Sequence, residues 1–301
     1  MTAALFPGQG SQAIGMARDF YRQSAAAKQV LDDSEAAIPG LLEVMWEGPE
    51  EKLRLTAYQQ PALVAAGAAA YRAYLEAGGG AARFAAGHSL GEFTAHVAAG
   101  SLPVSQAVQL VRNRGRYMQE CVPEGVGAMA AVLKLERQQV EGICREVDGV
   151  VEVANLNAPG QVVISGEAVA VAAAAHRLKA QGARLVPLNV SAPFHCSLMR
   201  PAAVRLAVDL ARVRFRPGNL EVVSNVTADV VADVTEAADL LERQVTSAVR
   251  WAESVERLAQ LGATRFLEFG SGRVLTGLVR RTLPEAQALA VTDMVSMKEA
   301  L

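Results

Sequence analysis

A serine held between two glycines is the residue of this chain best suited to covalent chemistry. The segment Gly87-His88-Ser89-Leu90-Gly91 fits the pattern G-x-S-x-G, with a short apolar run before it and a helical pattern after it. In that motif a tight strand-to-helix turn strains the serine and exposes its hydroxyl, and glycines flank it because a side chain there would collide with neighbouring backbone. The backbone N–H of Leu90 would then face a developing oxyanion. The pattern favours Ser89 as a nucleophile over the alternative of a helix N-cap serine.

A serine hydroxyl needs a base, and the chain has four histidines. His195, in SAPFHCSLM, is the best candidate because it stands where the chain is expected to leave a small inserted domain, and loops at domain junctions line clefts. The side chain of His88 should point away from that of Ser89, and His96 and His176 are expected to be structural or exposed. No histidine follows residue 195, whereas an ordinary α/β-hydrolase carries its histidine near the end of the chain. The pattern therefore departs from that of a plain esterase.

A cationic residue lies at the edge of an apolar helical stripe. The spacing of positions 104, 107, 108, 111, 115 and 118 predicts a helix over 104–118, and Arg114 falls beside its buried face. A buried guanidinium without a partner is very costly, so Arg114 either has an internal partner or binds an anionic ligand. Helical geometry alone favours an internal salt bridge and leaves the anionic ligand open.

Two glycine-rich segments resemble phosphate-binding loops, but the spacing of their glycines and the missing lysine argue against nucleotide binding. FPGQGSQ at 6–12 lacks the G-K-S/T of a P-loop, and FGSGRVLTG at 269–277 does not have the spacing G-x-G-x-x-G. A better use of the first loop is to supply backbone N–H donors near Ser89. Cys196, beside His195, is expected to be a small buried residue and not a nucleophile.

Short apolar segments alternate with helical patterns along the chain, which is typical of α/β architecture. Pro61 is expected to open a long alanine-rich helix that ends near Glu76. From about Gly125 the expected order is βαββαβ, typical of ferredoxin-like folds. Its elements are expected at 128–133, 136–146, 151–156, 162–165, 168–181 and 184–189. The sequence thus predicts a domain at 125–191 that is inserted into a larger domain made of residues 1–124 and 192–301.

Composition excludes several classes of protein. The 301 residues are 51% hydrophobic and 20% charged, which indicates an ordered globular chain, and the net charge of −2 gives no reason to expect nucleic-acid binding. Three cysteines without C-x-x-C spacing indicate neither a disulfide framework nor a zinc site, and they fit a reducing cytosol. The N-terminus does not have the pattern of a signal peptide, and charges interrupt every apolar run before membrane-spanning length. We therefore expect a cytoplasmic protein that binds neither membrane nor nucleic acid.

A series of motifs carries a family resemblance that covers nearly the whole chain. In order they are FPGQGSQ (6–12), QQPA (59–62), GHSLGE (87–92), RGRYMQ (114–119), GAMAAV (127–132), NAPGQVVISG (157–166), PFH (193–195) and VLTGL (274–278). The chain resembles malonyl-CoA:acyl carrier protein transacylases and, more distantly, the acyltransferase domains of polyketide synthases. The resemblance implies an α/β-hydrolase-like large domain with a ferredoxin-like insertion, and an active site in the cleft between them.

The resemblance also implies roles for single residues. Ser89 would attack the malonyl thioester, and His195 would take its proton. The backbone N–H groups of Gln9 and Leu90 would hold the tetrahedral oxyanion. A backbone carbonyl at the position of Gln244 would orient the histidine in place of a carboxylate.

Specificity for the malonyl group is expected to depend on a second set of side chains. Arg114 would bind the free carboxylate through two parallel hydrogen bonds. The resemblance therefore favours an anionic ligand for Arg114 over the internal salt bridge that helical geometry alone favours. Phe194 would crowd an α-methyl branch, which should make methylmalonyl a poor substrate. His88 and Asn157 are further substrate-binding candidates.

The implied reaction is ping-pong. Malonyl-CoA would acylate the serine, and the phosphopantetheine thiol of an acyl carrier protein would then remove the malonyl group, with no metal or redox cofactor. Because carrier proteins are acidic, a basic rim is expected, with Lys179, Arg184, Arg200 and Arg273 as candidates, and we expect a monomer. The alternatives are a trans-acting polyketide synthase acyltransferase, a serine thioesterase or esterase, and a non-catalytic carrier-docking protein.

Overall fold

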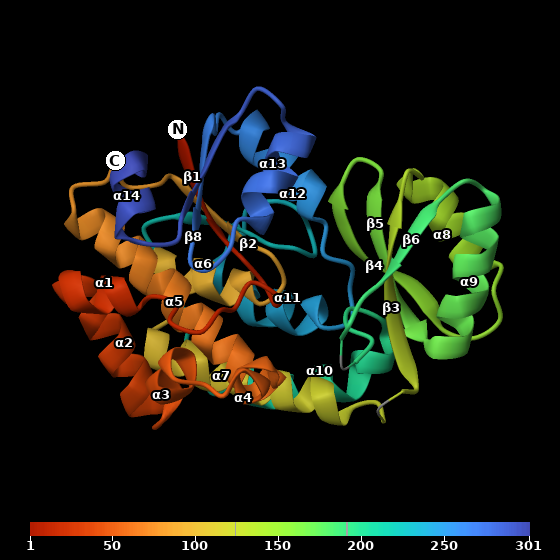
Figure 1. The fold of residues 1–301 in the computed structure, drawn as a ribbon, viewed down its shortest axis with the longest axis horizontal. Coiled ribbons are helices and arrows are strands. Elements are labelled where there is room, and N and C mark those ends of the chain that lie inside the picture. Colours follow the sequence, from red (N-terminus) through yellow and green to blue (C-terminus); the bar gives the residue numbers. More distant parts are fainter. Residues whose placement is uncertain (124, 191) are drawn as a thin grey trace.

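Five parallel strands form the larger of two sheets (Figure 1). The structure is a computed structural model that describes residues 1–123, 125–190 and 192–301. Across this sheet the strands lie in the order β7 (Glu221–Val223), β2 (Phe84–Gly87), β1 (Thr2–Phe6), β8 (Arg265–Phe269) and β9 (Gln287–Val291). Parallel strands that are buried on both faces are apolar throughout, and the central strands TAALF and FAAG have that character.

Helices cover both faces of this sheet. Alternate residues of β1 point to opposite faces, so Ala4 and Phe6 join one core while Ala3 and Leu5 join another. The first core is shared with α2, α5, α6 and α7, and the second with α12 and α13. The helices are α1 (Arg18–Gln23), α2 (Ala25–Ala37), α3 (Leu41–Trp46), α4 (Glu50–Arg54), α5 (Thr56–Glu76), α6 (Gly91–Ala99), α7 (Val104–Glu120), α10 (Arg200–Leu210), α11 (Ala237–Gln244), α12 (Trp251–Gln260), α13 (Val274–Thr282) and α14 (Met294–Ala300).

A second sheet of antiparallel strands lies to the right in Figure 1, with its own core. Its strands lie in the order β4 (Val151–Ala158), β5 (Gln161–Glu167), β3 (Gly127–Leu133) and β6 (Arg184–Pro187), with helices α8 (Arg137–Arg145) and α9 (Ala168–Ala180). The predicted βαββαβ order is confirmed, with ends that differ by a few residues. The chain thus has a mixed α/β fold. Glu124 and Ser191, at which the predicted domain boundaries fall, lie outside the described residues.

One helix boundary predicted from the sequence is wrong. Helix α5 begins at Thr56, so Pro61 lies inside it and does not open it. The hydroxyl of Thr56 donates to the carbonyl of Gly115 in α7 (2.8 Å), which anchors the true start of the helix on its neighbour. Tertiary packing therefore outweighs the cost of a proline in the second turn.

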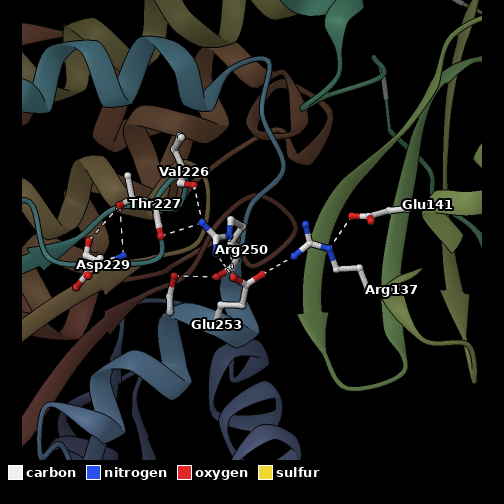
Figure 2. A network of polar contacts seen from close by, with 8 residues as sticks. Arg137, Glu141, Val226, Thr227, Asp229, Arg250 and Glu253 are labelled. Atoms are coloured by element: carbon white, nitrogen blue, oxygen red, sulfur yellow. Dashed lines mark hydrogen bonds and ion pairs between the residues drawn. The ribbon is translucent and has the colours of Figure 1, made fainter. Parts of the chain in front are cut away.

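Polar contacts join the inserted segment to the helices of the larger sheet (Figure 2). Arg137 of α8 contacts Glu141 through its Nε (2.6 Å), and its Nη1 contacts Glu253 of α12 (2.7 Å). Glu253 also accepts from Nε of Arg250 (2.8 Å). Backbone pairing supports this junction, because the N–H of Val249 donates to the carbonyl of residue 154 in β4 (2.9 Å). Among the described residues, each helix is too short or too polar to cross a membrane.

Candidate active site

Ser89 occupies the tight turn between β2 and α6, where its backbone adopts a φ of +52°. A Cβ on Gly87 would lie 1.8 Å from the carbonyl carbon of Gly91, and one on Gly91 would lie 2.0 Å from the carbonyl oxygen of Phe6. These distances confirm why glycines must flank the serine. The N–H of Ser89 donates to Oδ1 of Asn225 (2.7 Å), so the strained residue is held from the segment after β7.

His195 lies beside the serine hydroxyl. Its Nε2 is 2.7 Å from Oγ of Ser89, and its Nδ1 is 2.9 Å from the backbone carbonyl of Gln244. Since a carbonyl can only accept, Nδ1 carries the ring proton and Nε2 is left free to accept the serine proton. Burial, and then the positive charge of Arg114, lowers the pKa of His195 to about 3. The imidazole is therefore neutral at physiological pH, as a general base must be.

Arg114 is completely buried next to this pair. Its Nη1 donates to Oε1 of Gln60 (2.9 Å), and its Nη2 donates to Oγ of Ser89 (3.1 Å) and to Oε1 of Gln244 (3.0 Å). All three acceptors are neutral. Within the described residues Arg114 has no ion pair, so the internal salt bridge favoured by helical geometry alone is wrong. Burial lowers its pKa to about 10, with the negative charge of Glu92 acting in the opposite direction.

The loop after β1 packs against the tight turn that carries Ser89. A Cβ on Gly8 would lie 2.7 Å from the carbonyl oxygen of His88. The side chain of Gln9 donates to Oε1 of Gln59 (2.6 Å) and accepts from Gln60 (3.2 Å), which ties the loop to α5. Within the described chain the backbone N–H groups of Gln9 and Leu90 donate to no acceptor. Both are thus available for an oxygen of a substrate.

The other predicted substrate-binding residues surround this centre without touching the serine hydroxyl. Nε2 of His88 lies 2.8 Å from Oδ1 of Asn157 in β4, and its ring packs on Trp251. This contact joins the turn that carries Ser89 to the smaller sheet. Phe194 is buried directly before His195.

The remaining histidines and the neighbouring cysteine lie where the sequence predicted. His96 is buried with Nδ1 2.9 Å from Oγ of Ser101, and His176 is exposed on α9. Cys196 is buried, and burial raises the pKa of its thiol to about 11. No group of His, Cys, Asp or Glu side chains in the part of the chain that the structure describes could hold a metal ion.

Sequence reasoning assigned no separate role to three buried residues of this site. Gln60 accepts from Arg114, Asn225 holds the backbone of Ser89, and Glu92 accepts from Nε2 of Gln244 (2.6 Å). Gln60 and Glu92 belong to the motifs QQPA and GHSLGE, so a signal was present. Asn225 lies in no recognised motif.

Comparisons with known proteins place the chain in a family. A model of the acyl transferase domain family matches residues 4–299. The malonyl CoA-acyl carrier protein transacylase of Bacillus subtilis is 42% identical over 99% of the chain and 96% of that protein, and the one of Escherichia coli is 43% identical over 99% and 98%. Among solved structures, a type II PKS acyl-carrier protein in complex with its malonyl-transacylase has a TM-score of 0.96 and 43% identity, covering 100% of this chain and 98% of that chain.

Proposed function

Because the chain belongs to the acyl transferase domain family, we propose that it transfers malonyl groups from malonyl-CoA to the phosphopantetheine thiol of an acyl carrier protein. The chain is an acyltransferase of the kind that supplies units for fatty-acid synthesis. The observation that carries the malonyl specificity is the buried guanidinium of Arg114, 3.1 Å from the hydroxyl of Ser89. A fixed positive charge at the nucleophile suits an acyl group that ends in a carboxylate.

In the first half-reaction Oγ of Ser89 attacks the thioester carbonyl carbon while Nε2 of His195 accepts the hydroxyl proton. The carbonyl of Gln244 stabilises the resulting imidazolium through Nδ1. The oxyanion accepts hydrogen bonds from the N–H groups of Gln9 and Leu90. The carbon–sulfur bond then breaks, and the imidazolium returns its proton to the leaving CoA thiol, which leaves a malonyl ester on the serine.

In the second half-reaction the carrier's thiol gives its proton to His195 and attacks the ester carbonyl. The ester bond breaks, and Oγ of Ser89 regains a proton from the imidazolium. One thioester is exchanged for another, so the chemistry calls for no metal or redox cofactor. Four exposed cations without an ion pair in the described residues are candidates for docking an acidic carrier: Lys179, Arg184, Arg200 and Arg273.

The guanidinium also gives a magnitude for specificity. An acetyl group would bring no carboxylate to Arg114, whose direct hydrogen-bond acceptors are all neutral, at a cost of about 3–5 kcal/mol. That free energy corresponds to a preference for malonyl of roughly several hundred-fold or more. Phe194, packed next to His195, is placed to disfavour an α-methyl branch.

The arrangement of the two sheets supports a finer description of the fold. We assign the five-stranded parallel unit to an α/β-hydrolase-like domain of residues 1–124 and 192–301. The order β4-β5-β3-β6 corresponds to a ferredoxin-like domain at 125–191. A monomer in the cytoplasm fits this proposal.

Intact-protein mass spectrometry after incubation with malonyl-CoA tests the proposed function. The wild type should gain one malonyl group and lose it when carrier protein is added, and Ser89→Ala should gain none. Cys196→Ala is the matched control, because its thiol lies next to His195 but has no role in the proposal. Rapid release of free malonate without transfer to the carrier would instead identify a hydrolase.

A further inference from the structure

Glu92 is a buried carboxylate that the mechanism above does not use. It lies on α6 one turn after Ser89 and is 0% exposed. Its Oε2 accepts from Nε2 of Gln244 (2.6 Å) and from the N–H of Asn225 (3.1 Å). Its Oε1 has no hydrogen-bond partner within the described residues. A charged group in this position needs a compensating charge nearby.

The side-chain amide of Gln244 connects this carboxylate to the guanidinium. Its oxygen accepts from Nη2 of Arg114 (3.0 Å), while its nitrogen donates to Glu92. One amide dipole is therefore aligned between a cation and an anion that form no direct ion pair. Nε of Arg114 also has no partner within the described chain, so the guanidinium retains capacity for a further anion.

Burial has the largest effect on the ionisation of Glu92, and Arg114 is the one charged group among the described residues that acts on it. The groups facing Glu92 from α11 and from the segment after β7 are neutral, namely Gln244, Ser224 and Asn225. On its own helix, burial lowers the pKa of His96 to about 4, and across the site the pKa of His195 is about 3, so both imidazoles are uncharged. Burial raises the pKa of Glu92 to about 7, and Arg114 opposes that rise.

We propose that Glu92 is the internal counter-ion of Arg114 and takes up a proton when the carboxylate of an acyl group binds the guanidinium. This inference rests on the proposed function. A second anion on the same cation disfavours ionisation of the first, so the malonyl carboxylate replaces Glu92 as the partner of Arg114. The coupling is reciprocal, so protonation of Glu92 in turn favours malonyl binding.

Acylation itself consumes no proton, which makes the uptake measurable. Serine hydroxyl and malonyl-CoA give a malonyl ester and the CoA thiol, with hydrogen atoms balanced. The additional proton comes from solvent and forms an O–H bond on the carboxylate of Glu92. An acetyl group brings no carboxylate and leaves Glu92 ionised.

A pH indicator in weakly buffered solution detects this proton. Uptake after addition of malonyl-CoA, normalised to the adduct found by mass spectrometry, should exceed the acetyl baseline, and it cannot exceed the ionised fraction of Glu92, about half a proton per site at pH 7 and about nine-tenths at pH 8. Acetyl-CoA, which releases the same CoA thiol, supplies the baseline and should give none.

Variants assign the proton to a residue. Glu92→Gln keeps the shape and an acceptor oxygen, and it should still form the adduct while uptake disappears. Glu92→Asp retains a carboxylate on a shorter side chain and should retain uptake. Glu268→Gln is the matched control, because Glu268 is equally buried but caps the N-terminus of α13, and its uptake should equal that of the wild type.

The outcomes separate this inference from the function on which it rests. A malonyl adduct that forms without proton uptake, or with uptake unchanged in Glu92→Gln, would contradict the counter-ion role of Glu92. It would not contradict the proposed transferase function. Absence of any adduct in the wild type overturns both. If Glu92 only positioned Gln244, then Glu92→Gln would slow malonyl and acetyl transfer equally and leave uptake unaltered.

Discussion

The guanidinium of Arg114 is desolvated but not directly neutralised. Its hydrogen-bond acceptors are an amide oxygen of Gln60, an amide oxygen of Gln244 and the hydroxyl of Ser89. Hydrogen bonds to neutral oxygens recover only part of the hydration that a buried cation loses. The site therefore holds an electrostatic preference for an anionic acyl group before any substrate arrives.

Replacing Arg114 by alanine tests this preference. We expect malonyl transfer to fall several hundred-fold or more, because about 3–5 kcal/mol of charge pairing is lost, while acetyl transfer is retained or improved. The measurement is kcat/KM for malonyl-CoA and acetyl-CoA. Arg112→Ala and Arg116→Ala, on the exposed face of the same helix, are matched controls and should keep the wild-type ratio. An unchanged malonyl/acetyl ratio in Arg114→Ala would rule out carboxylate binding by Arg114.

The buried imidazole predicts an unusual pH profile. A base is active above its pKa, and the pKa of His195 is lowered from the ordinary 6.5 to about 3. Lowering the pH from 7 to 5 should therefore leave the base neutral, and kcat/KM for malonyl-CoA should not decline over that range. Stopped-flow acylation at each pH measures this, with circular dichroism to verify the fold. An acid limb with a midpoint near 6.5 would contradict the structure.

Residue types and spacing pointed to Ser89 and His195, which the structure places side by side, but not to the groups that orient them. Ser89 is marked by its flanking glycines, and His195 was selected from only four histidines. Gln244 acts on His195 through its backbone carbonyl, which leaves no side-chain signature, so only the family resemblance pointed to it. The helical stripe showed that Arg114 is buried but could not name its partners, because these come from α5 and α11.

At the scale of elements, the tight turn at Ser89 depends on how closely β2, α6 and β1 approach one another. Gly91→Ala should destabilise the protein by about 3 kcal/mol or more, because the new Cβ would meet the backbone oxygen of Phe6 at 2.0 Å. Gly142 in α8 is the control, since a Cβ there meets nothing within 4 Å. Gly142→Ala should stabilise by about 0.5–1 kcal/mol. Urea unfolding measures both, and a mild effect at Gly91 would contradict the geometry.

Elements with strong periodicity were predictable, and short ones were not. The strands and helices between 127 and 187 alternate clearly enough for their order to be derived. Helices α1, α3 and α4 have only five or six residues each, too few to show a helical period, so the sequence predicted none of them. Strand β9 was not predicted either, because its pattern QALAV gives little signal before it pairs with β8.

At the scale of the whole molecule, the site depends on how the two sheets are joined. The contact between His88 and Asn157 crosses that junction, so the smaller sheet supports the turn that carries Ser89. The ion pair of Arg137 and Glu253 (Figure 2) and the backbone pairing of Val249 with β4 are further contacts across this junction.

The backbone pairing should matter more than the ion pair. Arg137 and Glu253 keep 47% and 30% of their side-chain surface exposed, so a double-mutant cycle should give a coupling below about 1 kcal/mol and unchanged malonyl transfer. Val249 is fully buried, and Val249→Pro removes the N–H that donates to residue 154, so it should cost about 3 kcal/mol or more and slow transfer. Val249→Ala keeps that N–H and separates its loss from lost packing. If breaking the ion pair slowed transfer as much as the proline did, then electrostatics and not strand pairing would set the position of the smaller sheet.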